Sequence, residues 1–272
     1  MTKRTTKQIA LISVFATLIV IVTRLPGIPI LGGMAAGGGQ IELSTILYPL
    51  IGIALGPWFG MLAVLIGNFI AWIIPTSTIF GLLMIPAGSF AALISGSLTR
   101  QGRWSNWKIA AIVLSLLIIV WYITPTGRNI PFYPVLHLAA LGILLLSREK
   151  INALCKDTSR MKILFGVGLC SFIATMGEHM FGGLAWMLSA PIYVNLTLLR
   201  NALRNLLGPF LGAKWVTLGG LAKPDDPLSL FFMATLLPIP IYPIERLLIT
   251  AGSTLLSVGV IRTIGWGRLM EL

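Results

Sequence analysis

Charged residues are scarce in this sequence of 272 residues. Only 10% of them are Asp, Glu, Lys or Arg, whereas soluble domains usually carry about 25%. Hydrophobic residues make up 56%, and the mean hydropathy is +0.92. These values exclude an ordinary soluble domain. They indicate a multi-pass protein of the cell membrane, with a single transmembrane domain over residues 1–272.

Clusters of catalytic or metal-binding residues are also missing from the sequence. It contains no HExxH, GxSxG or Walker motif and no Cys/His metal cluster. Asp157, Asp225 and Asp226 lie outside the apolar runs, although a metal-dependent prenyl transferase would need clustered aspartates for magnesium. Cys155 and Cys170 lack metal-ligand spacing and are expected to be reduced. We therefore predict no enzyme activity, no cofactor and no metal, which disfavours an intramembrane enzyme acting on lipid.

Acidic residues are few, and the net charge is +12. In a soluble protein this charge would suggest nucleic acid, but here the basic residues fall in short loops between apolar runs. Thirteen of the twenty lie in segments that would be cytoplasmic if eight spans start from a cytoplasmic N-terminus. Positive charge in short loops marks the inner side of a membrane. Both termini are therefore expected in the cytoplasm, and no nucleic-acid partner is expected.

The apolar stretch over residues 41–74 is too long for one span, which takes about 20 residues. Gly56 and Pro57 interrupt it once. Because proline is tolerated in the first turn of a helix, we expect Gly56 to end one helix and Pro57 to begin the next. Gly60 and Gly67 share roughly one helical face with Gly56 and would let a neighbouring helix approach closely. The stretch predicts a close-packed membrane hairpin.

The hydropathy pattern predicts an all-α bundle of six to eight transmembrane helices. The eight candidate spans are residues 8–23, 41–55, 57–74, 79–98, 109–122, 132–146, 163–188 and 244–264. Pro86 should kink the fourth span. The glycine-rich segment 24–40 is either a lid over a cavity or a connector, and segment 190–228 fits an amphipathic or re-entrant helix better than a full span.

Glu178 and His179 are adjacent ionisable residues within an apolar span. Such residues are costly to insert, by roughly 2.5–3.5 kcal/mol each, and usually face a cavity or another helix. We predict that they line a ligand cavity. The structural alternative is a buried pair satisfied by neighbouring helices.

Five further residues are candidates for substrate contact. Glu42 begins the second span, where it could instead favour the helix dipole. Asn68 and Trp72, four residues apart, could offer an amide and an aromatic surface to a ligand, or an interhelical hydrogen bond and a membrane-interface anchor. Asn195 and Arg200 lie in the amphipathic segment, where the arginine could bind an anionic group or lipid head groups.

The run STILYPLIGIALGPWFGMLAVLIGN resembles the second and third helices of the substrate-binding S components of energy-coupling-factor (ECF) transporters. Gly56, Pro57 and Gly60 match the family pattern, whereas Val64 replaces a glycine and Asn68 replaces an acid. The glycine-rich first loop and the last helix also look like those of the family. The usual number of spans in the family is six, so residues 109–146 look like an inserted helix pair.

The resemblance implies a membrane subunit that captures a vitamin or related small molecule outside the cell. It would then work with a transmembrane scaffold subunit and two ATPases, docking through small residues on the first helix. Ala10 lies at the matching position, and Ser13 with Thr17 supplies the nearest small pair. The alternative is an independent secondary transporter or channel-like protein, for which a broken helix and an ion site near the membrane midplane would be typical.

Overall fold

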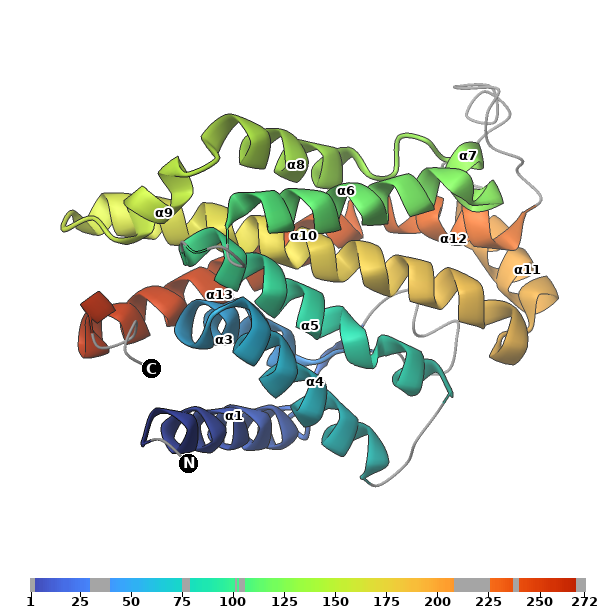
Figure 1. Cartoon of the computed structure of the whole chain (residues 1–272). Helices are drawn as coiled ribbons and strands as arrows, with labels where there is room; N and C mark the ends of the chain where they lie inside the picture. Colours follow the sequence, from blue (N-terminus) through green and yellow to red (C-terminus); the bar gives the residue numbers. More distant parts are fainter. Residues whose placement is uncertain are drawn as a thin grey trace.

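The protein is a bundle of helices, most of them running lengthwise, in the computed structural model (Figure 1). The structure describes residues 3–29, 40–74, 79–100, 102, 106–207, 226–236 and 240–267. Helix α1 begins and helix α13 ends at the same end of the bundle, and the short helices α7 and α11 lie at the opposite end (Figure 1). The described part is helical apart from one pair of two-residue strands, in agreement with the predicted all-α class.

The N-terminal half contains the predicted hairpin. The elements of this half are α1 (Lys3–Val22), β1 (Ile28–Pro29), β2 (Gln40–Ile41), the 3₁₀ helix η1 (Leu43–Ile46), α3 (Leu47–Leu55), α4 (Pro57–Ile73), α5 (Ile79–Thr99), α6 (Trp107–Ile123) and α7 (Pro125–Asn129). The predicted hairpin is α3 with α4. The antiparallel strands β1 and β2 bracket residues 30–39, so the predicted glycine-rich lid falls mostly outside the described residues.

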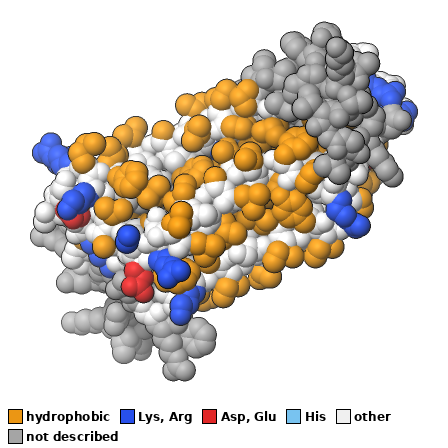
Figure 2. All heavy atoms as spheres, turned by 90° about the horizontal axis from the view of Figure 1, so that it is seen from above, with side chains coloured by type: hydrophobic (Ala, Val, Ile, Leu, Met, Phe, Trp, Pro, Cys, Tyr) orange, Lys and Arg blue, Asp and Glu red, His pale blue; other side chains and the backbone are white. Residues whose placement is uncertain are grey.

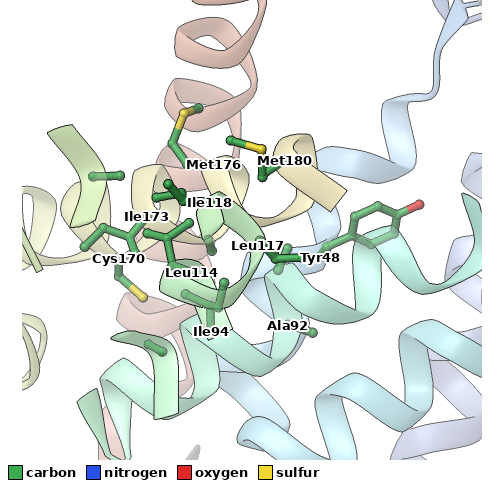
Figure 3. Close-up of a cluster of buried hydrophobic side chains, with 14 of the residues drawn as sticks. Tyr48, Ala92, Ile94, Leu114, Leu117, Ile118, Cys170, Ile173, Met176 and Met180 are labelled. Carbon is green, nitrogen blue, oxygen red and sulfur yellow. The ribbon is translucent and has the colours of Figure 1, made fainter. Parts of the chain in front are cut away.

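The C-terminal half is built around one long helix. Its elements are α8 (Val135–Ser147), α9 (Lys150–Cys155), α10 (Arg160–Tyr193), α11 (Leu196–Leu207), α12 (Pro227–Leu236) and α13 (Ile241–Ile264). Helix α10 has 34 residues and packs against α5, α6, α8, α9 and α13. Figure 3 shows part of the resulting core, where Ile94, Leu114 and Ile173 are fully buried between α5, α6 and α10.

The hairpin closes as its sequence predicts. Gly56 has a φ of 83°, a left-handed conformation that favours glycine, and Pro57 occupies the first turn of α4. Gly60 faces the α3 backbone so closely that an added Cβ would lie 2.9 Å from Cα of Gly52. A Cβ on Gly52 would in turn overlap the carbonyl oxygen of Ala92 on α5. Helices α3, α4 and α5 therefore meet backbone to backbone, and we call this contact the glycine seam.

The surface has the form expected of a membrane protein. Figure 2 shows a broad hydrophobic face between two ends at which Lys and Arg side chains gather, more of them at the end that carries α9. Three helices are long and apolar enough to cross a membrane: α5 from Phe80, α10 and α13. The other apolar helical stretches have 10–17 residues, counting α1 from Thr6 and joining η1 to α3. Eight spans and cytoplasmic termini therefore remain predictions, as do the single domain and the inserted pair, which corresponds to α6 through α8.

The segment after α10 contains a short helix, α11, with a buried and an exposed side. On α11, Leu199 and Leu203 are buried whereas Asn201 and Arg204 are exposed. Residues 208–225 lie outside the described residues, so the path of the rest of segment 190–228 remains a prediction. Both cysteines are buried and free of disulfides, in agreement with the reduced state expected for them.

Candidate functional site

A cavity of about 140 Å³ lies between α5, α10, α12, α13 and the turn that precedes α8. It is nearer to the end of the bundle that carries α11 and α12 than to the end where α1 begins (Figure 1). Its polar walls come from Glu178 and His179 on α10 and from Glu245 and Arg246 on α13. Its aromatic walls are Tyr133, Trp186, Phe231, Phe232 and Tyr242.

Arg246 lies between two glutamates at the polar wall. Its Nη1 is 3.7 Å from Oε1 of Glu178, and its Nη2 donates a hydrogen bond to Oε1 of Glu245. All three side chains are largely buried, with exposed fractions of 9%, 9% and 12% for Arg246, Glu178 and Glu245. Oε2 of Glu178 is buried and has no hydrogen-bond partner among the described residues. The wall thus combines two carboxyl groups, one guanidinium and one unused acceptor.

A second polar pair lies beside this cluster. His137 Nε2 and His179 Nδ1 are 3.1 Å apart, and the two rings stack with centroids 5.2 Å apart. His137 is fully buried on α8, whereas His179 lines the cavity. The ring of Tyr242 stacks on His179 from the other wall, with centroids 4.8 Å apart. The hydrogen bond and the stacking together restrict the orientation of the His179 ring.

Aromatic rings line the rest of the cavity. Trp186 stacks on Phe231 with centroids 3.8 Å apart, and Phe232 meets both rings edge-on. The hydroxyl of Tyr242 donates a hydrogen bond of 2.8 Å to the carbonyl oxygen of Tyr133, which joins α13 to the turn before α8. Rings held in this way form a flat, rigid surface for a ligand.

Two of the seven predicted substrate-contact residues, Glu178 and His179, line this cavity, and five lie elsewhere. Glu42 occupies the position before η1 without a side-chain capping bond, and its Oε2 accepts a hydrogen bond from Ser44. The hydroxyls of Ser44 and Tyr48 are 3.1 Å apart, and Tyr48 donates to Oδ1 of Asn68. Asn68 also donates to the carbonyl oxygen of Ile85. Glu42 and Asn68 therefore belong to one hydrogen-bond chain that connects η1, α3, α4 and α5.

The remaining three candidates are spread over the bundle. Trp72 packs against Phe69 on α4 with ring centroids 5.9 Å apart. Asn195 caps α11, because its Oδ1 accepts hydrogen bonds from the backbone N–H groups of Thr197 and Leu198. Arg200 is half-buried on α11. Their contact with a substrate stays a prediction.

The predicted docking face lies on the exposed side of α1. Ala10, Ser13 and Thr17 are all exposed. The two hydroxyls bond within the helix, Ser13 to the carbonyl oxygen of Ile9 and Thr17 to that of Ser13. No side-chain hydroxyl on this face is therefore committed to another helix among the described residues.

Sequence reasoning missed three polar residues of the site. They are His137 on α8, which contacts His179, Arg246 on α13, which contacts Glu178, and Glu245, which bonds to Arg246. The signal was present, because Glu245 and Arg246 are ionisable residues beside a long apolar run, as Glu178 is. Both lie in the first turn of the predicted span 244–264. Among the described residues, no group of three or more His, Cys, Asp or Glu side chains is placed to hold a metal ion.

Comparison with known proteins supports the predicted resemblance. Residues 3–136 match the family model described as ECF-type riboflavin transporter, S component, which denotes a transporter subunit rather than a class of enzyme. The N-terminal part of the chain is thus similar to these S components. It is also 30% identical over 152 residues to the uncharacterized protein MJ0923 of Methanocaldococcus jannaschii, which covers 56% of this chain and 50% of that protein. The chain thus spans about half the length of this curated relative. No solved structure matches it.

Proposed function

We propose that this protein is the substrate-binding subunit of an ECF-type transporter, which captures a vitamin or related small molecule outside the cell for uptake. The observation that carries the proposal is the cavity whose wall holds a buried carboxylate oxygen without a partner among the described residues. A buried, unsatisfied acceptor is unfavourable. A ligand that donates a hydrogen bond to this oxygen would remove the unfavourable energy. The family match over residues 3–136 provides the transporter context.

The location of the cavity agrees with this role. It lies away from the end that bears the start of α1 and the end of α13, where more of the Lys and Arg side chains visible in Figure 2 gather. If those termini are cytoplasmic, as the charge distribution predicts, the cavity is nearer to the outer surface. Glu178 and His179 would contact the solute. The exposed face of α1 would contact a transmembrane scaffold subunit, which in turn binds the ATPases.

Purification of the tagged chain from its native membrane tests this assignment. We expect a scaffold subunit and two ATPases to be recovered with it, and mass spectrometry to detect a retained small molecule. Uptake into liposomes by the chain alone, driven by an ion gradient, would instead support the secondary-transporter alternative. Recovery of neither partners nor solute would contradict the proposal.

The substitution Glu178→Gln should lower the amount of retained solute by about tenfold or more, because a hydrogen bond to a charged group contributes roughly 1.5–3 kcal/mol. Membrane insertion should be unchanged. Asp157→Asn is the matched control. Asp157 is an acidic residue in the connection before α10, and it pairs with the exposed Lys162 on α10. Equal retention by Glu178→Gln and the parent chain would remove Glu178 from the site.

The substitution Ser13→Trp should prevent docking without disturbing the fold, because Ser13 is exposed and has no side-chain contact that the bundle needs. We expect recovery of the scaffold subunit to fall by about tenfold, which corresponds to roughly 1.4 kcal/mol of association energy. Leu146→Trp is the control, because Leu146 is 82% exposed on α8. Unchanged recovery with Ser13→Trp would place docking on another helix.

A further inference from the structure

We propose that the solute is a small, flat cation with a single ring, whose positive group contacts Glu178. This inference deepens the proposed function and depends on it. It concerns the chemistry that the cavity selects. The region that matches the family model contributes only Met84 and Tyr133 to the cavity walls that the structure describes, so the solute has to be inferred from the cavity itself.

The wall holds more carboxyl groups than guanidinium groups. Glu178 and Glu245 bring two carboxyl groups, and Arg246 is the single Lys or Arg among the described residues that line the cavity. Both Nη atoms of Arg246 face the glutamates, one each. A buried ionised carboxylate is costly unless it is paired. A cation in the cavity would balance the second carboxyl group and use the free Oε2 of Glu178.

An anion in the cavity would be repelled by the carboxyl groups of the wall. Nε of Arg246 also lacks a hydrogen-bond partner among the described residues, so it is the donor to which an anion could bind. The guanidinium, however, is already flanked by two carboxyl groups. Like charges at contact distance in a region of low dielectric constant repel strongly. The cavity therefore discriminates against carboxylates and phosphates.

The size and walls of the cavity define the rest of the ligand. Its volume of about 140 Å³ is close to that of an engineered apolar cavity of about 150 Å³ that binds benzene. Pockets for larger, drug-sized ligands usually measure about 300–1,000 Å³. Trp186, Phe231 and Tyr242 present aromatic rings, which favour flat ligands and attract cations over their faces. One ring with a positive group fits these walls.

Three probes of one shape test the charge preference: benzamidine, which is positively charged at neutral pH, neutral benzamide and anionic benzoate. Binding to the purified full chain is measured by isothermal titration calorimetry in detergent. We expect benzamidine to bind about tenfold or more tightly than benzamide, and benzoate to bind least, because charge-assisted hydrogen bonds are stronger than neutral ones. This order is measured on the parent chain, so it does not depend on a variant that folds.

Glu178→Gln then identifies the residue responsible. It should weaken benzamidine binding by about tenfold to a hundredfold and leave benzamide within about threefold. Asp157→Asn, which removes an acid outside the cavity, should change neither value. Binding of benzoate at or above the level of benzamidine, or no binding of benzamidine, overturns the inference. The proposed function is judged separately, by recovery of a scaffold subunit and a retained solute, so each can fail alone.

Discussion

Replacing Arg246 with methionine is expected to destabilise the protein by about 3–5 kcal/mol, the usual cost of leaving a buried charge without its partner. Arg246 is 8% exposed and contacts Glu178 on α10 as well as Glu245 on its own helix. Its removal would leave two buried carboxyl groups facing each other. Thermal unfolding in detergent, followed by size-exclusion chromatography, would show a lower melting temperature.

Two further variants make the Arg246 result specific. Arg262→Met removes a basic residue from the same helix, but Arg262 is exposed and should be nearly neutral. The triple variant Arg246→Met, Glu178→Gln, Glu245→Gln removes the uncompensated charges and should recover much of the lost stability. If Arg246→Met has the same melting temperature as the parent chain, the three side chains do not form a coupled buried cluster.

Replacing Gly52 with valine is expected to disrupt the glycine seam. A Cβ at this position would overlap the carbonyl oxygen of Ala92 and the hydroxyl of Ser95 on α5. A backbone carbonyl cannot rotate out of the way as a flexible side chain can, so the helices would have to separate. Overpacking usually costs about 1–3 kcal/mol, and we expect a value at or above the upper end of this range. Lower melting temperature and lower yield of folded protein would measure it.

Gly259→Val is the matched control for the seam. Gly259 is an exposed glycine within helix α13, and a Cβ there would meet no described atom within 4 Å. Its replacement should change stability by no more than about 0.5 kcal/mol. Equal effects of Gly52→Val and Gly259→Val would show that the seam is loose enough to accept a side chain.

The helices were predictable because hydropathy and turn residues act locally. The turn at Gly56 and Pro57 fell where expected, and the predicted spans 109–122 and 132–146 correspond to α6 and α8. Less predictable were the 3₁₀ start of the second span and the continuation of α10 to Tyr193, past Pro191. The 3₁₀ helix contacts α13, and Tyr193 packs on Phe80 of α5; hydropathy does not report such contacts.

The site was predictable only in part, for a similar reason. Glu178 and His179 stood out because an ionisable residue in an apolar span requires an explanation. Their partners Arg246 and His137 come from α13 and α8. Pairing of side chains between helices leaves no periodic signal in one sequence. Asn68 forms the interhelical hydrogen bonds that were one of its two predicted roles, to Tyr48 and to the α5 backbone, and its contact with a substrate stays a prediction.

The glycine seam also determines which wall of the cavity could act as a gate. Because α3, α4 and α5 touch through their backbones, we expect them to move as one unit. Helix α13 is much less enclosed by its neighbours than α5 or α10, and it carries both Glu245 and Arg246. An outward swing of α13 would keep this adjacent pair together and break the 3.7 Å contact between Arg246 and Glu178. The contact between Arg246 and Glu178 would then hold the cavity closed. A solute cation that pairs with Glu178 in place of Arg246 would allow α13 to move.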